Sequence, residues 1–445
     1  MRTVLKRSRW RPLCLLLFWL SLGVALLIGQ PVSAINPPNA NEEIRGVWLT
    51  TNDTDTLIDR PRLQSALEQL ARLNFNTVYP VVWNAGYALY PSVTAERAGI
   101  QSFVRRGLQD YDILAEVTAI AHRQGMLSIP WFEFGFMAPA TSELALNHPD
   151  WLTQQRDGRK TSVSDAGEVA WLNPFHPEVQ QFMTNLVIEL LARYDVDGIQ
   201  FDDHFSLPSE FGYDPYTIAL YQAETGQPAP SNYHDPSWVR WRANKITAYV
   251  QQLHSLVKAR KPRAIFSVSP NPYRYAYLGH LQDWLTWVRR GLVDELIVQV
   301  YRDNLQAFRE QLRQPEVQET RRQIPTGIGI LTGLRNAPVS MDFIQEKIRT
   351  ARAYGLGMSF FFYESLWEDS PEPAETRQSG FLALFPERSA RSRPTVRPVA
   401  QTAMPETTVP SPPPAAPAVP AMPVPSGRTT HYRSGHQGTL SRVAP

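Results

Sequence analysis

The feature that most constrains the fold is a regular alternation of two kinds of segment between residues 45 and 384. Short runs of β-branched or aromatic residues are each followed by a longer stretch with apolar residues at positions i, i+3, i+4 and i+7, the spacing of a helix with one buried face. Eight rounds of this alternation occur. Strands that alternate with helices form a parallel sheet, and eight such units in about 340 residues predict an α/β fold, the closed (β/α)8 TIM barrel.

The predicted elements follow one another strictly in turn. The strands are Arg45 to Leu49, Thr77 to Trp83, Leu127 to Phe134, Gly198 to Asp202, Ile265 to Ser269, Glu295 to Tyr301, Thr326 to Leu331 and Met358 to Tyr363. The helices are Arg60 to Leu73, Tyr111 to Gln124, Pro177 to Tyr194, Pro236 to Arg260, Leu281 to Arg290, Leu305 to Arg313, Asp342 to Tyr354 and Ala374 to Leu384. An open doubly wound sheet is the alternative, but no glycine-rich phosphate-binding turn follows the first strand.

Capping and turn residues support these boundaries. The predicted N-caps are Asp110 and Ser340, the first-turn prolines are Pro177 and Pro236, and the glycines after helix ends are Gly125, Gly291 and Gly355. Connections are long only where a strand leads into a helix, as in Asn84 to Leu108, Gly135 to His176 and Ser206 to Asp235. Long loops at the C-terminal ends of barrel strands build a binding cleft, so we expect the functional site there.

Both ends of the chain differ in composition from the barrel, which is predicted to span residues 35–385. Residues 1–34 combine a positively charged start, an apolar run from Leu13 to Ile28 and a small-residue site ending at Ala34. This pattern predicts a cleaved secretory signal peptide, with an uncleaved membrane anchor as the alternative. Residues 386–445 are rich in Pro, Ala, Thr, Ser and Val. They predict an extended, disordered tail, either a tether within the envelope or a segment without function.

The composition favours an exported protein whose ligand carries little charge. Lysine plus arginine number 44 and aspartate plus glutamate 42, a net charge of +2, which does not suggest a nucleic-acid surface. The only cysteine, Cys14, lies in the predicted signal peptide, so the mature chain has no disulfide or thiol nucleophile. Export without disulfides suits a protein of the bacterial periplasm, cell envelope or extracellular space. No membrane span is expected after signal cleavage.

Carboxylates stand where the predicted strands end at the cleft. They are Asp202 and Asp203 after the fourth strand, Glu133 at the third and Glu364 at the eighth. Hydrolysis of a glycosidic bond needs two carboxyl groups, one protonated and one ionised. Because side chains alternate along a strand, Asp202 shares a face with Gln200 and is expected in the cleft, with Asp203 turned toward a loop or orienting a neighbour. Glu133 and Glu364 compete as the general acid, and a structural cap or calcium site is the alternative for the aspartate pair.

Aromatic and amide side chains accompany these carboxylates at the predicted strand ends. Sugar rings stack on aromatic rings, and their hydroxyl groups bond to carboxylates and amides. Part of these rings is expected to serve packing alone. The predicted substrate-binding residues are Trp48, Tyr79, Trp83, Trp131, His204, Asn271, Gln299, Tyr301, Tyr363 and Trp367. No cofactor or catalytic metal is predicted, since the histidines lack ligand spacing, and no Gly-x-Ser-x-Gly motif points to an esterase.

Five motifs in this order resemble the glycosyl-hydrolase-like 10 family of bacterial exported proteins. They are Glu43-Ile-Arg-Gly-Val-Trp-Leu49, Asn74-Phe-Asn-Thr-Val-Tyr79, Trp171-Leu-Asn-Pro-Phe-His-Pro-Glu178, Asp197-Gly-Ile-Gln-Phe-Asp-Asp203 and Gln299-Val-Tyr301. The resemblance spans residues 42 to 385 and implies a barrel glycosidase that acts on a bacterial polysaccharide, for some members peptidoglycan strands without peptides. The fourth and fifth motifs are also similar to those of chitinase-type glycosidases, but Gln200 and His204 replace two acidic residues there.

Taken together, these features predict an exported glycoside hydrolase. Its expected substrate is an envelope or extracellular polysaccharide, with peptidoglycan glycan strands or another N-acetylated glycan favoured. Asp202 is the central residue in this prediction, and Glu133 or Glu364 is its partner. The alternative is a catalytically inactive barrel that binds carbohydrate or serves as a scaffold in the envelope.

Overall fold

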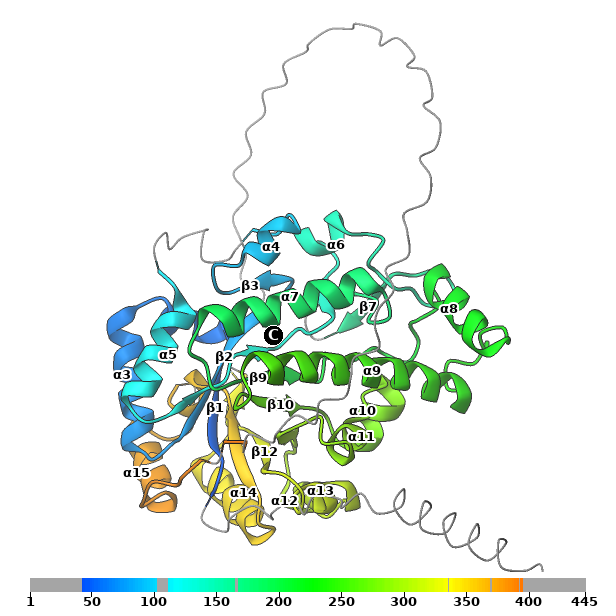
Figure 1. The fold of residues 1–445 in the computed structure, drawn as a ribbon. Helices are drawn as coiled ribbons and strands as arrows, with labels where there is room; N and C mark the ends of the chain where they lie inside the picture. The colour runs from blue at the N-terminus through cyan, green and yellow to red at the C-terminus, as the bar shows by residue number, and fades with distance from the viewer. Residues whose placement is uncertain are drawn as a thin grey trace, which may run out of the picture.

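The computed structural model describes residues 42–101, 111–164, 167–334, 336–368, 370–391 and 393–394. Within them the predicted (β/α)8 barrel is confirmed (Figure 1): eight parallel strand positions form a ring, because β1 (Arg45–Leu49) pairs with both β2 (Thr77–Asn84) and β15 (Gly357–Phe361). The ring continues through β5 (Trp131–Phe132), β9 (Gly198–Asp202), β10 (Ile265–Ser269), β11 (Glu295–Gln299) and β12 (Thr326–Leu331). The predicted signal peptide and the N-cap Asp110 lie outside the described residues.

The third strand of the barrel is interrupted. The predicted strand from Leu127 to Phe134 consists of β4 (Leu127–Ser128) and β5, separated by Pro130. Proline has no amide hydrogen and so cannot donate to a neighbouring strand. Its carbonyl still accepts from Gln200 N at 2.8 Å, and Ile129 N donates to Val78 O at 3.0 Å. The sheet therefore stays continuous around the proline.

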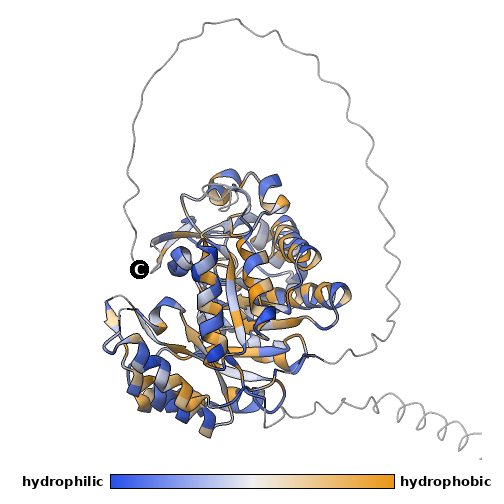
Figure 2. Cartoon of the chain, turned by 90° about the vertical axis from the view of Figure 1, so that its left-hand side faces the viewer, coloured by the Kyte–Doolittle hydropathy of each residue, from blue (hydrophilic) through white to orange (hydrophobic). Residues whose placement is uncertain are grey.

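Helices cover the outside of the barrel (Figure 1). They are α3 (Arg60–Arg72), α5 (Ile113–Arg123), α7 (Pro177–Arg193), α9 (Pro236–Arg260), α11 (Trp284–Arg289), α12 (Leu305–Leu312), α13 (Pro315–Thr320), α14 (Met341–Ala353) and α15 (Ala374–Leu384). Figure 2 shows hydrophilic and hydrophobic residues mixed along the helices, and in α3 the buried residues repeat at helical spacing, as Leu63, Leu67 and Leu70 do. None of the helices in the described ranges is long and apolar enough to cross a membrane.

Cap residues explain where several helices begin. Ser340 caps α14 as predicted, its side chain accepting from Phe343 N. The second predicted helix instead begins after Asp112, whose side chain accepts from Ala115 N. Pro177 and Pro236 stand in the first turns of α7 and α9.

Additional elements lie in the loops that follow the strands. They are η1 (Thr51–Asp53), α2 (Thr54–Leu57), β3 (Tyr87–Ala88), α4 (Val93–Arg97), β6 (Met137–Pro139), α6 (Glu143–Asn147), β7 (Thr161–Ser164), β8 (Gly167–Trp171), α8 (Pro215–Thr225), α10 (Tyr273–His280), β13 (Gly333–Leu334), β14 (Ala337–Pro338) and η3 (Glu364–Leu366). The longest insertion joins β5 to α7 and holds the three-stranded antiparallel sheet β6-β8-β7. These elements gather at the C-terminal end of the barrel, where the sequence predicted the cleft.

Side chains of β9 alternate between the barrel interior and the helix layer, as predicted. The Gln200 side chain points inward, where its amide donates to Ser267 Oγ at 2.9 Å and its oxygen accepts from Trp48 Nε1 at 2.7 Å. Phe201 points outward and stacks on Phe205, with ring centroids 3.9 Å apart. Asp202, two residues after Gln200, therefore belongs to the inward face.

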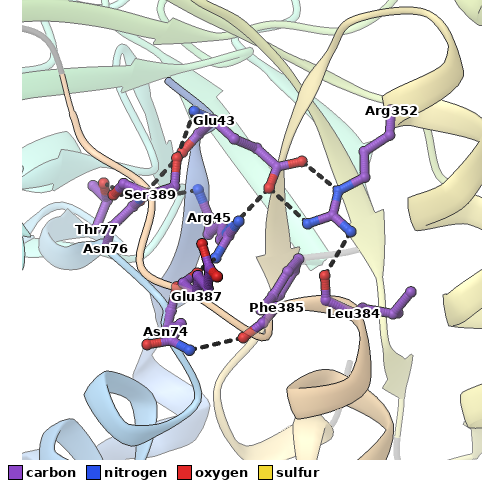
Figure 3. Close-up of polar contacts among 10 residues, drawn as sticks. All are labelled: Glu43, Arg45, Asn74, Asn76, Thr77, Arg352, Leu384, Phe385, Glu387 and Ser389. Carbon is purple, nitrogen blue, oxygen red and sulfur yellow. Dashed lines mark hydrogen bonds and ion pairs between the residues drawn. The ribbon is translucent and has the colours of Figure 1, made fainter. Parts of the chain in front are cut away.

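The chain after α15 runs along the N-terminal end of the barrel (Figure 3). Asn74 Nδ2 donates to Phe385 O at 2.7 Å, and Arg45 donates to Glu387 O at 2.5 Å. The Ser389 hydroxyl accepts from Glu43 N at 2.8 Å. The packed part of the chain thus extends beyond residue 385, where the sequence analysis placed the start of the disordered tail.

Two arginines continue this segment toward buried carboxylates. Arg391 forms an ion pair with Glu295, and the two side chains are 8% and 1% exposed. The same carboxylate accepts from Tyr79 OH at 2.8 Å and from Ser267 Oγ at 2.9 Å. Arg393 pairs with buried Asp197. The rest of the predicted tail, from residue 395 on, lies outside the described residues.

Candidate active site

Asp202 ends β9 and is held by side chains of the next two strands. Its Oδ1 accepts from Ser269 Oγ of β10 at 2.9 Å and from Gln299 Nε2 of β11. Gln299 also donates to Ser269 O at 2.8 Å, so the three side chains form one bonded group. Asp202 is only 5% exposed. The carboxyl group is therefore fixed at the floor of the barrel mouth.

Asp203 lies nearer to solvent than Asp202. Its side chain is 21% exposed, and its Oδ2 accepts from Asn271 Nδ2 at 2.5 Å. The second oxygen is 3.3 Å from His204 Nδ1, which also lies 3.0 Å from the backbone oxygen of Glu133. The structure thus leaves the Asp203 carboxylate more accessible to solvent than the Asp202 carboxylate. The sequence analysis had instead expected Asp202 to take the more direct role.

Glu133 is the third carboxyl group of this cluster. It follows β5 and accepts from Asn84 Nδ2 at the end of β2. Burial, assisted by the negative charge of Asp203, raises its pKa to about 7, although the Asn84 bond and the His204 charge act in the opposite direction. Glu133 therefore keeps its proton in mildly acidic solution, where an exposed glutamate has lost it.

The carboxyl groups influence one another electrostatically. Burial raises the pKa of Asp202 well above its usual value, and the charges of Asp203 and Glu133 add to this effect. Burial, together with the same three carboxyl groups, also raises the pKa of Tyr301. The Tyr301 ring packs on Phe361 with centroids 5.6 Å apart. One site therefore contains the three carboxyl groups and a neutral phenol, and neighbouring carboxylates of this kind resist simultaneous ionisation.

Glu364, Tyr363 and Trp367 lie apart from this cluster. The backbone nitrogen of Glu364 donates to Asp53 at 2.7 Å, and the Tyr363 hydroxyl donates to Gln69 of α3 at 3.3 Å. The Trp367 ring packs against Phe381 of α15, with centroids 5.9 Å apart. This loop therefore contacts the first loop and the helix layer, and the structure does not bring Glu364 together with Asp202.

Four rings predicted to bind substrate are buried in the protein. Trp48, Tyr79, Trp83 and Trp131 are each at most 1% exposed. Trp48 and Tyr79 bond inside the barrel to Gln200 and Glu295, as described above. Trp83 Nε1 donates to Gly135 O at 3.1 Å, and its ring packs on Phe182 of α7 at 5.6 Å. Trp131 packs on Trp48 at 6.2 Å. These rings belong to the core and offer no stacking surface.

Three site residues were not singled out from the sequence. Asn84 holds Glu133, and Gln282 Nε2 donates to the backbone oxygen of Asp202 at 3.0 Å. His280 ends α10, and burial lowers its pKa while the charge of Asp203 acts to raise it. All three lie in or beside long loops, where no periodic pattern marks them.

A cation site is the other chemistry that this cluster suggests. Asp202, Asp203 and His204 each offer a ligand atom within 4.8 Å of the others, the one such group among the described residues. The partners that surround the two carboxylates are hydrogen-bond donors, namely Ser269, Gln299 and Asn271. Ca²⁺ instead takes six to eight oxygen ligands. The arrangement is thus better suited to orienting carboxyl groups toward a substrate.

Comparison with known proteins identifies the family. The sequence model of the glycosyl hydrolase-like 10 family matches residues 43–349. The chain belongs to this family. Its similar relatives include the glycosyl hydrolase DigH of Escherichia coli K12, 27% identical over 323 residues that cover 61% of this chain and 70% of the relative. Glycosyl hydrolase YngK of Bacillus subtilis is 23% identical over 311 residues, covering 62% of this chain and 58% of YngK.

Solved structures of glycosidases share the barrel of this glycosyl hydrolase-like 10 protein. The glycoside hydrolase domain of PgaB (BpsB) from Bordetella bronchiseptica superposes with a TM-score of 0.58 at 13% identity, covering 76% of this chain and 98% of that domain. An α-L-fucosidase from Paenibacillus thiaminolyticus gives a TM-score of 0.55 at 16% identity, over 76% and 48% of the two chains. At these identities the likeness establishes the fold alone, the (β/α)8 barrel.

Proposed function

We propose that this protein hydrolyses O-glycosidic bonds of a polysaccharide and that Glu133 is the general acid. The observation that carries the proposal is the buried Glu133 carboxyl, which Asn84 orients beside Asp203 and Asp202 and whose pKa burial raises to about 7. Glycosidases combine a protonated carboxyl group, which donates to the leaving oxygen, with an ionised one. Glu133 fits the first role because it retains its proton at mildly acidic pH.

Asp203 fits the role of the ionised carboxylate. Asn271 and His204 fix its two oxygens, and its side chain is partly exposed to the barrel mouth. Asp202 is more buried, and the charge of Asp203 is among the causes that raise its pKa. We therefore assign to Asp202 a supporting role beneath Asp203, a reversal of the ranking that strand alternation suggested.

The proposed mechanism uses only side chains of the cluster. Glu133 gives its proton to the glycosidic oxygen as the bond to the leaving sugar breaks, and the oxygen of a water molecule bonds to the anomeric carbon of the remaining sugar. Asp203 stabilises the positive charge that develops on that sugar or accepts the proton that the water releases. Asn84 keeps the Glu133 carboxyl oriented. Tyr301, a neutral phenol, is available to bond a substrate hydroxyl or the carboxylate.

The favoured substrate is a peptidoglycan glycan strand or another N-acetylated glycan. Family membership and the chitinase-like motif around Asp202 support this choice, as does the small net charge of +2. The signal-like residues 1–34 support export to the periplasm, cell envelope or extracellular space. The Pro-rich residues 395–445 are proposed to tether the barrel within the envelope.

The test is digestion of three glycan preparations by the purified mature protein: intact peptidoglycan, amidase-treated glycan strands and chitin oligomers. We expect new reducing ends, detected by mass spectrometry, from one of these classes. Glu133→Gln should abolish them, whereas the matched variant Glu364→Gln should not, because Glu364 lies apart from the cluster. Binding of a glycan without any product would refute hydrolysis and favour the non-catalytic carbohydrate-binding alternative.

A further inference from the structure

The short helix α10 is fixed against the strand end that carries the aspartate pair. Two backbone bonds join it to the loop after β9: Leu207 N donates to His280 O at 3.0 Å, and Ser209 N donates to Gly279 O at 2.8 Å. Just beyond the helix, Gln282 bonds to the backbone of Asp202. The position of α10 relative to the catalytic cluster is therefore determined by several independent contacts.

His280 connects the cluster to the surface of α10. The charges of Asp203, His204 and Glu210 all act on its imidazole, which is half-buried. On the same helix the Tyr275 ring lies against His280, with centroids 5.0 Å apart and planes inclined by 50°. The Tyr275 ring thus lies against a histidine whose imidazole the charge of Asp203 reaches.

Tyr275 differs from the other two tyrosines of α10. Tyr273 and Tyr277 stack on each other at 5.8 Å and are half-buried, and the Tyr273 hydroxyl donates to Asp283 at 2.9 Å. Tyr275 is 58% exposed. The next turn of the helix carries Gly279, where a Cβ would come to 3.8 Å from the Tyr275 ring, so no side chain there covers it. Tyr275 thus presents much of its ring to solvent, on the helix that two backbone bonds fix to the loop after β9.

We propose that Tyr275 and His280 form a further sugar-binding subsite, which holds a unit of the N-acetylated glycan next to the one bound at Asp203. The proposal rests on the proposed function, whose substrate it extends along the surface of α10. An exposed tyrosine offers a flat face for the C–H side of a sugar ring and a hydroxyl for its polar edge. His280, whose imidazole lies against the Tyr275 ring, supplies a second polar edge.

The test measures binding, so that it does not depend on cleavage. Chitobiose, chitohexaose and amidase-treated glycan strands are titrated calorimetrically into the mature protein carrying Glu133→Gln, with and without Tyr275→Ala. Tyr275→Ala removes the stacking ring and is expected to weaken binding of chitohexaose and of the glycan strands about fivefold. Binding of chitobiose should weaken much less, because a short ligand does not need a distal subsite. Tyr275→Phe should retain most of the affinity, since it keeps the ring.

Tyr233→Ala is the matched control. Tyr233 is also an exposed tyrosine, at 41%, and its ring also lies beside a histidine, His234, at 4.3 Å. Tyr233 precedes α9, and Tyr233→Ala is expected to leave the affinity for all three glycans unchanged. Equal weakening by Tyr233→Ala, or unchanged binding of long glycans by Tyr275→Ala, would overturn the subsite.

The two proposals fail in distinguishable ways. If the protein without the Glu133 substitution cleaves none of the glycans but Tyr275→Ala still weakens binding selectively, hydrolysis is refuted and the subsite stands. If the wild type cleaves a glycan and Tyr275→Ala binds long and short forms as the wild type does, the subsite alone is refuted. Absence of binding to chitohexaose and to the glycan strands would overturn an N-acetylated glycan as its occupant.

Discussion

Replacing Glu133 by glutamine should stabilise the fold increasingly as the pH rises. Burial raises the pKa of this carboxyl from its usual 4.5 to about 7 in the folded protein. Its contribution to stability is therefore fully present below pH 4.5, and it is lost progressively as the pH rises toward 7, because the unfolded chain releases the proton first. Glutamine is neutral throughout and can accept the same bond from Asn84.

The size of the effect follows from the two pKa values. Each unit of difference between the folded pKa of about 7 and the unfolded pKa of 4.5 is equivalent to about 1.36 kcal/mol of stability. The free energy of unfolding of the wild type is therefore about 3 kcal/mol lower at pH 8 than at pH 4 because of this group. We therefore expect Glu133→Gln to have a stability near that of the wild type at pH 4 and to exceed it by up to about 3 kcal/mol at pH 8.

The measurement is urea unfolding of both proteins at a series of pH values, followed by fluorescence. Glu346→Gln provides the control, because Glu346 is an exposed residue of α14 and the variant removes a carboxyl group of the same kind without changing Glu133. A Glu133→Gln difference that stays constant between pH 4 and pH 8 would refute the raised pKa, and with it the reason for choosing Glu133 as the acid.

Three further predictions address the two arginines after α15 and the active site. Arg391→Met should lower the free energy of unfolding by about 3 to 5 kcal/mol, because it leaves the buried Glu295 carboxyl without its cation. Arg393→Met should lower the free energy of unfolding by about 1 kcal/mol or less, since the Arg393 side chain is 49% exposed. Equal losses of unfolding free energy in the two variants, measured by urea unfolding, would contradict this prediction. The basic limb of the activity profile should lie near pH 7 and move to higher pH in His204→Gln, because the His204 charge lowers the pKa of Glu133. A limb that moves to lower pH would contradict this assignment.

The barrel was predictable because strand-like apolar runs and amphipathic helical stretches alternate along the whole barrel region. The predicted bounds of β1, β9, β10 and β12 agree with the structure at both ends. Differences arose from local features. Pro130 divides the third strand, and the predicted helix from Leu281 to Arg290 is shorter than expected. Leu281 has a left-handed φ of 57°, which ends α10, so α11 starts only after its cap Asp283.

The site was predictable in part, because strand ends identify which residues reach the mouth but not where each side chain points. Glu133 follows β5, and the aspartate pair stands at the end of β9. The two strands are neighbours in the ring, so the structure brings the three carboxyl groups together. Glu364 also follows a strand, yet the chain turns there into η3 and toward Asp53. His280 comes from a loop helix without any periodic signal. Its role depends on backbone bonds between distant segments, which composition and spacing do not record.

The most direct test of the central claim compares leaving groups. Aryl glycosides of the sugar that the wild type releases are hydrolysed by the wild type and by Glu133→Gln, and kcat/KM is measured against the acidity of the released phenol. A phenol that leaves readily as an anion needs no proton, so the variant should approach the wild type for acidic phenols and fall at least about a hundredfold behind for weakly acidic ones. A uniform loss across the series would show that Glu133 does not donate the proton.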